Sequence, residues 1–132
     1  MMNIARIIFG IIYLLGAGFN IFIVATQGWQ TYIGFADETF LPWYREAWMS
    51  IAAPNITLIV ILLIAFEISL GLLFIVRRKY LKIALILGTL FCLASMPTMV
   101  EALYTNLPLA LIQAILLWKE FRLSPKSKTS GD

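Results

Sequence analysis

The chain has 132 residues, of which 61% are hydrophobic and 13% are charged, with one cysteine and no histidine. A soluble domain carries about a quarter of its residues as charged side chains, so a fraction this low indicates a surface that faces lipid. The absence of histidine excludes a histidine-ligated haem or copper centre. A single thiol excludes an intrachain disulfide and a cysteine-ligated iron–sulfur cluster. The composition therefore predicts a small integral membrane protein.

Four apolar stretches approach the length of about 20 residues that a helix needs to cross a bilayer. They lie at residues 4–25, 55–76, 83–102 and 107–121. The first is longer than the apolar core of a secretory signal, and no small-residue cleavage site follows it, so we expect it to remain as a helix. We predict an all-α protein, an integral membrane four-helix bundle that forms a single domain over residues 1–123. A disordered basic tail is expected at 124–132.

The basic residues indicate how the bundle is oriented. Of the ten lysines and arginines, all except Arg45 fall on one side of a four-span topology. Cytoplasmic loops carry the excess of lysine and arginine, so we expect both termini to be cytoplasmic. This topology is that of a multi-pass membrane protein. It also explains the net charge of +3, so that no nucleic-acid partner is needed.

The connections between the spans differ in length. Short turns at 77–82 and at 104–106 favour antiparallel neighbours. The long outer loop at 26–54 is rich in aromatic residues, which recur at helical spacing from Trp29 to Ala36 and again from Trp43 to Ile51. We predict two short amphipathic helices on the outer leaflet. They act either as an aromatic anchor in the lipid headgroups or as a lid over an outward-facing cavity.

Polar residues inside the spans are costly and usually face the bundle interior. Arg6, Tyr13, Asn20 and Gln27 are spaced by seven, which places them on one slowly drifting stripe of the first span. Glu67 lies in the second span with Gly71 one turn later. Counting about 1.5 Å per residue places Glu67, Tyr13 and Cys92 at one depth, with Gln113 slightly lower.

We predict that the phenol of Tyr13 and the amide of Gln113 hydrogen-bond Glu67 in this layer. A carboxyl among apolar groups favours its neutral form, so we expect a protonated Glu67. Three roles stay open for it: a structural contact between helices, contact with a ligand, and proton transfer in transport. Cys92 is interpreted as a small buried hydrophobic residue.

The third span contains Pro97, which we expect to kink the helix. Ser95, Thr98 and Glu101 lie beside this kink, opposite Asn20 and Gln27, and together could line an outward-facing pocket. The same residues also fit an ordinary packed kink. A stripe of small residues, Ala84, Gly88, Cys92 and Ser95, favours close approach of a neighbouring helix.

The first span, with Ala5-Arg6-Ile7-Ile8-Phe9-Gly10 leading into Leu15-Gly16-Ala17-Gly18-Phe19-Asn20, resembles the first span of DoxX-like inner-membrane proteins. The stretch Phe66-Glu67-Ile68-Ser69-Leu70-Gly71-Leu72-Leu73-Phe74 is similar to their second span, and the likeness covers about residues 4–100. The resemblance implies a four-helix bundle that spans a bacterial inner (cytoplasmic) membrane. Some relatives are small subunits of quinone-linked sulfur-oxidising enzymes or membrane partners of soluble oxidoreductases. Arg6 and Glu67 match the recurring polar positions of the family.

Three functions are compatible with these features. The first is an accessory or anchoring subunit that binds quinone or lipid and recruits a membrane or soluble oxidoreductase or a cell-envelope partner. The second is a homo-oligomeric, proton-linked transporter or channel that uses Glu67. The third is a lipid-modifying membrane enzyme. We assign no catalytic residue, no metal and no resident cofactor. Ligand-binding or proton-linked roles fall to Glu67, Tyr13, Gln113, Asn20 and Glu101, and structural roles to Arg6, Pro97 and Gly71.

Overall fold

The computed structural model describes residues 2–96 and 100–123, and within these ranges every regular element is a helix. The all-α prediction is confirmed. The α-helices are α1 (Met2–Gln27), α2 (Phe35–Glu38), α3 (Pro42–Ala47), α4 (Ile56–Val76), α5 (Leu81–Ser95) and α6 (Val100–Leu123). Short 3-10 turns η1 (Trp29–Tyr32), η3 (Ala53–Asn55) and η4 (Arg78–Tyr80) and a π-helical turn η2 (Trp48–Ala52) connect them.

Three helical segments in the described part of the chain are long and apolar enough to cross a membrane: Asn3–Gln27, Pro42–Val76 and Ala102–Leu123. The chain is therefore a plausible multi-pass membrane protein. The third predicted span, 83–102, is divided between α5 and the start of α6. The kink expected at Pro97 and the tail at 124–132 lie outside the described residues.

The turn predicted at 104–106 is wrong. Helix α6 begins at Val100 and continues through Tyr104, Thr105 and Asn106. These residues are polar, but none of them is glycine or proline, so nothing in their backbone chemistry ends a helix. The proline that follows, Pro108, lies inside α6 and lacks the N–H that would bond the carbonyl of Tyr104.

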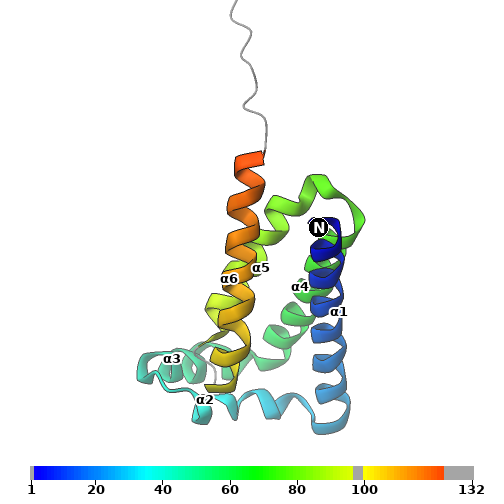
Figure 1. Cartoon of the computed structure of the whole chain (residues 1–132). Helices are drawn as coiled ribbons and strands as arrows, with labels where there is room; N and C mark the ends of the chain where they lie inside the picture. The colour runs from blue at the N-terminus through cyan, green and yellow to red at the C-terminus, as the bar shows by residue number, and fades with distance from the viewer. Residues whose placement is uncertain (1, 97–99, 124–132) are drawn as a thin grey trace, which may run out of the picture.

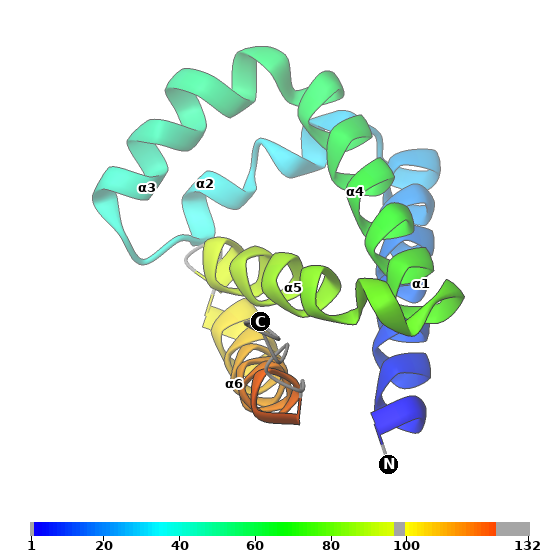
Figure 2. The same ribbon diagram turned by 90° about the horizontal axis from the view of Figure 1, so that it is seen from above.

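The long helices form two packed pairs. Helix α1 packs along α4, and α5 packs along α6, whereas α4 and α5 have a smaller contact (Figures 1 and 2). The chain runs alternately up and down, so the start of α1, the turn after α4 and the end of α6 lie at one end, called here the basic end (Figure 1). The loop that contains α2 and α3 lies at the other end, called the loop end.

Backbone contact between two glycines holds α1 against α4. A Cβ atom on Gly71 would lie 2.9 Å from the carbonyl oxygen of Gly10 and 2.8 Å from Cγ of Leu14. A Cβ atom on Gly10 would lie 3.0 Å from the carbonyl oxygen of Gly71. Each glycine therefore leaves room for the other helix, as at many helix contacts in membranes.

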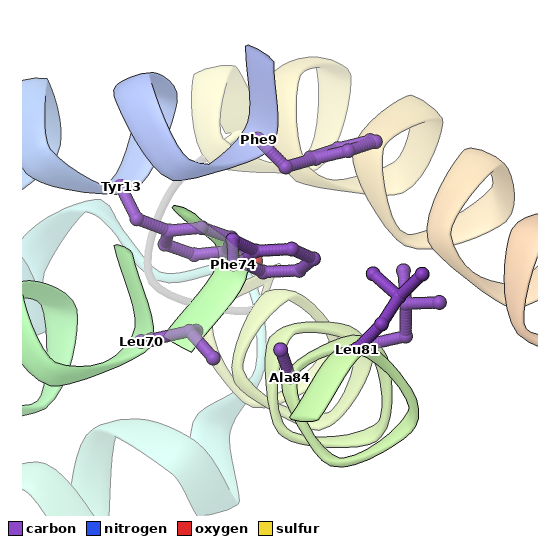
Figure 3. Close-up of a cluster of buried hydrophobic side chains, with 7 residues drawn as sticks. Phe9, Tyr13, Leu70, Phe74, Leu81 and Ala84 are labelled. Atoms are coloured by element: carbon purple, nitrogen blue, oxygen red, sulfur yellow. The ribbon is translucent and has the colours of Figure 1, made fainter. Parts of the chain in front are cut away.

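A cluster of buried apolar side chains joins α1, α4 and α5 (Figure 3). Phe9 and Tyr13 of α1 both stack on Phe74 of α4, with ring centroids 5.8 Å and 5.7 Å apart. Leu70 of α4 lies below them, and Leu81 of α5 closes the cluster at its other side. The aromatic rings thus fix the spacing between the first helix pair and α5.

The loop between α1 and α4 is not a solvated linker, because part of it packs on the bundle. Tyr32 and Ala36 are each 2% exposed. Tyr32 lies in an apolar cluster with Ile23 of α1 and with Ile56 and Val60 of α4. In contrast, Trp43 of α3 and Ile51 of η2 are mostly exposed. The two predicted amphipathic helices are observed as four shorter pieces, η1, α2, α3 and η2.

The glycine contact can be tested with the substitution Gly71→Ala. The added methyl group overlaps the α1 backbone, so we expect a loss of about 1–3 kcal/mol in the free energy of unfolding, measured in mixed detergent and lipid micelles. The matched control is Gly18→Ala, because a Cβ atom on Gly18 meets nothing within 4 Å. Equal stability of the two variants would contradict the close approach of α1 and α4.

Candidate functional site

The buried polar side chains form two separate groups. The first, called here the tyrosine cluster, consists of Tyr13 of α1, Gly88 and Cys92 of α5, and Gln113 of α6. The side chains of Tyr13, Cys92 and Gln113 are 5%, 1% and 0% exposed. The cluster therefore joins the two helix pairs in a place shielded from the surroundings of the protein.

Tyr13 is the centre of this cluster. Its Oη lies 3.1 Å from Oε1 of Gln113, 3.2 Å from the carbonyl oxygen of Gly88 and 3.5 Å from Sγ of Cys92. Nε2 of Gln113 donates to the same sulfur at 3.5 Å. If the thiol donates to the phenol oxygen, the phenol can donate to Gln113 and the amide to the sulfur, so that one closed ring of hydrogen bonds forms.

Glycine at position 88 is a condition for this arrangement. A Cβ atom there would overlap Oε1 of Gln113 and would lie 2.7 Å from Oη of Tyr13. At Gly88, the stripe of small residues therefore leaves room for polar side chains of α1 and α6. The sequence had instead predicted that the backbone of a neighbouring helix approaches this stripe closely.

The second group, called here the carboxyl chain, links Glu67 of α4 to the loop. Nδ2 of Asn20 donates to Oε2 of Glu67 at 2.7 Å. The hydroxyl of Tyr32 donates to Oδ1 of Asn20 at 2.7 Å, with the carbonyl oxygen of the same residue at 3.3 Å. Nε1 of Trp48 donates to the carbonyl oxygen of Tyr32 at 3.0 Å. This series of hydrogen bonds thus runs from the η2 turn, through η1 and α1, to Glu67, which is 6% exposed.

The hydrogen bonds predicted from Tyr13 and Gln113 to Glu67 are wrong, because both groups bond to α5 or to each other. The depth estimate placed these side chains at one level but did not fix the direction in which they point around α1. Tyr13 points to α5 and α6, whereas Gly16 and Asn20 face Glu67. A Cβ atom on Gly16 would lie 3.0 Å from Oε1 of Glu67.

The remaining predicted site residues lie in different places. Asn20 belongs to the carboxyl chain through its bond to Glu67, whereas Gln27 at the end of α1 is exposed. Arg6 is half-buried, and its Nε has no hydrogen-bond partner in the described protein. Glu101 lies in α6, but its side chain and Thr98 are outside the described set. The predicted outward-facing pocket therefore receives no support from the residues that are described.

Sequence reasoning missed the parts of Tyr32, Trp48 and Cys92 in these networks. Tyr32 and Trp48 were noticed only as aromatic loop residues. Cys92 was placed at the depth of Tyr13, but it was interpreted as a small hydrophobic residue and its hydrogen bonds were missed. Burial, followed by the charge of nearby Glu67, raises the pKa of Tyr32 above its ordinary value. Tyr32 therefore stays neutral over the physiological pH range, and its hydroxyl can donate the hydrogen bond to Asn20.

Two apolar grooves lie outside the polar groups. The larger, called the α4–α5 groove, has a volume of about 440 Å³, and its lining is Ile59, Leu62, Leu63, Phe66, Leu87, Leu90, Phe91 and Ala94. The smaller, of about 260 Å³, lies along α3 and η2. A hydrogen bond of 3.2 Å from the hydroxyl of Tyr44 to the carbonyl oxygen of Ala94 connects α3 with the end of the larger groove that is nearer the loop end.

Within the described ranges, no group of three or more histidine, cysteine, aspartate or glutamate side chains is arranged to hold a metal ion. Comparison with protein families, with curated proteins and with solved structures finds no significant match to this chain. The chemistry of the site therefore has to be argued from the side chains themselves. They offer one buried carboxyl, one phenol cluster and an apolar groove.

Because the Tyr32 hydroxyl donates a hydrogen bond to Asn20, we predict that this hydroxyl helps to hold the loop on the bundle. Tyr32→Phe removes one hydrogen bond, worth about 1 kcal/mol, and keeps the apolar packing of the ring. We expect hydrogen exchange of the amides in η1 and α2 to become about five-fold faster, measured by mass spectrometry in lipid nanodiscs. The control is Tyr104→Phe, because Tyr104 is 75% exposed. Unchanged exchange in Tyr32→Phe would show that the hydroxyl does not fasten the loop.

Proposed function

We propose that α5 forms a further membrane span, so that the chain is a four-helix bundle with both termini in the cytoplasm. The separation of the charged residues supports this topology. Arg6, the turn after α4 and the end of α6 lie at the basic end, and Asp37, Glu38 and Glu46 lie at the loop end. Because cationic ends stay in the cytoplasm, the loop would face the outside of a bacterial inner membrane.

Within this topology we propose that the chain is a DoxX-like accessory subunit that binds a quinone or a membrane lipid and recruits an oxidoreductase or a cell-envelope partner. The motifs around Arg6 and Glu67 support membership of that family. The observation that carries the binding function is the α4–α5 groove. Its volume of about 440 Å³ is within the range of about 300–1,000 Å³ that is usual for small-molecule sites.

The lining of the groove suits the hydrocarbon part of such a ligand. All of its lining residues are apolar, and the rings of Phe66 and Phe91 lie 5.3 Å apart where α4 meets α5. Two of its lining residues, Leu62 of α4 and Leu90 of α5, are 55% and 58% exposed, so a molecule dissolved in the bilayer could reach the groove. Tyr44 and the exposed Trp43 lie at the loop end, where the polar head of the ligand or a partner protein would make contact.

Glu67 has a structural role in this proposal. Its partner is Asn20 of α1, and the carboxyl does not line the groove. Together with the Gly10–Gly71 contact, the Asn20–Glu67 hydrogen bond ties α4 to α1 and leaves the groove-lining face of α4 to the ligand. Tyr13 and Gln113 likewise join helices, so the bound molecule would meet an apolar surface and not a set of reactive side chains.

The substitution Ala94→Phe tests the groove. The new ring occupies the outer end of the groove, so we expect co-purifying quinone or lipid, detected by native mass spectrometry in mild detergent, to fall at least ten-fold. The matched control is Ala65→Phe, an exposed position on α4 that does not line the groove. If the two variants retain the same ligand to the same extent, or if the unaltered protein carries no bound quinone or lipid, the proposal is wrong.

A further inference from the structure

A strongly charged surface lies at the basic end, between the start of α5 and the last turns of α6. The described cations at this end are Arg6, Arg77, Arg78, Lys79, Lys82, Lys119 and Arg122. Among residues 2–96 and 100–123, Glu120 is the only carboxylate in the same region. The surface therefore carries a net positive charge that the described part of the chain does not neutralise.

Aromatic rings hold several of these cations in place. Nζ of Lys82 lies 4.9 Å from the ring centroid of Phe121, which brings the start of α5 directly against the end of α6. The guanidinium of Arg122 lies 4.1 Å from the ring of Trp118. Cation–π contacts of this kind restrain long side chains that would otherwise be free in solution. The positive charge at this end is thus partly pre-organised.

The position of the rings indicates what the surface meets. Trp118 and Phe121 are 55% and 57% exposed, and Leu123, at the very end of α6, is 71% exposed. Tryptophan is typical of the level at which lipid headgroups meet the hydrocarbon. Lys119 and Arg122 are three residues apart on α6 and so lie on one face of its last turn. Charge and exposed apolar area are therefore adjacent, as on a surface that contacts lipid headgroups.

We propose that this surface, made by Lys82, Lys119 and Arg122 with Trp118 and Phe121, binds the headgroup of an anionic phospholipid. The phosphate would accept hydrogen bonds from the ammonium and guanidinium groups, and the first part of the acyl chains would pack on the two rings. An acidic soluble protein fits less well, because it would have to cover the exposed apolar rings as well. The site is at the opposite end from the α4–α5 groove and does not depend on the proposed function.

The experiment uses the full chain in mild detergent, with phosphatidylglycerol and phosphatidylcholine of the same acyl composition added in equal amounts. Native mass spectrometry counts the lipids retained. We expect the unaltered protein to retain phosphatidylglycerol in preference. Lys119→Gln and Arg122→Gln should each lower this preference about five-fold, since a cation near an anionic membrane surface contributes about 1 kcal/mol. High salt should lower it as well.

The matched control is Arg45→Gln, which removes an exposed cation from the loop end and should leave the lipid preference unchanged. Equal retention of the two lipids by the unaltered protein would overturn the proposal whether or not the variants fold. An equal loss in Arg45→Gln would overturn it too, because the effect would then depend on net charge alone. Binding of polyglutamate without a preference for phosphatidylglycerol would identify a surface for an acidic protein.

Discussion

The arrangement of the long helices depends on the hydrogen bonds that the Tyr13 hydroxyl makes. Lipid is as apolar as most side chains of this protein, so burial of apolar area gives little force for one helix to associate with another in a bilayer. Close backbone contact and interhelical hydrogen bonds have to supply it. Helices α1 and α4 have a glycine contact, and α5 packs along α6, but the polar contacts that join one pair to the other converge on Tyr13. The cluster around it therefore sets the angle between the pairs, and with it the width of the α4–α5 groove.

The carboxyl chain extends the same principle to the loop. An isolated carboxyl in an apolar helix is costly, and here its cost is offset by an amide that is itself held by a loop tyrosine. The apolar cluster around Tyr32 in turn keeps the loop on α1 and α4 at the loop end. The loop is rich in aromatic residues because the rings of Tyr32 and Trp48 pack on the bundle and also carry polar atoms that belong to the carboxyl chain. The loop thus has a part that packs on the bundle, η1, and an exposed part, α3. The headgroup anchor and the lid over an outward-facing cavity both stay predictions.

The sequence predicts the helical class and the residues of interest better than it predicts their partners. Long apolar runs are enough to find α1 and α4, and the rarity of polar residues in them singles out Tyr13, Asn20 and Glu67. The partners were missed because a seven-residue spacing drifts by about 20° per repeat, and because the tilt of a neighbouring helix decides which residue of the stripe it meets. Gly71 was given a structural role without a partner, and it lies against the backbone of α1 at Gly10. The boundary between α5 and α6 was misplaced because the polar residues 104–106 were taken as a turn signal, although polar character alone does not require a helix to end.

The central claim is that the phenol of Tyr13 and the amide of Gln113 interact directly and so join α1 to α6. A double-mutant cycle with Tyr13→Phe, Gln113→Leu and the combined variant measures this interaction as a coupling free energy of unfolding in lipid-containing micelles. The structure predicts that the combined variant loses less stability than the sum of the single variants, with a coupling of about 0.6 kcal/mol and up to about 1.7 kcal/mol, the range for hydrogen bonds between membrane helices. If the two losses simply add, the helix pairs are not joined through Tyr13, and the arrangement of the bundle described above is contradicted.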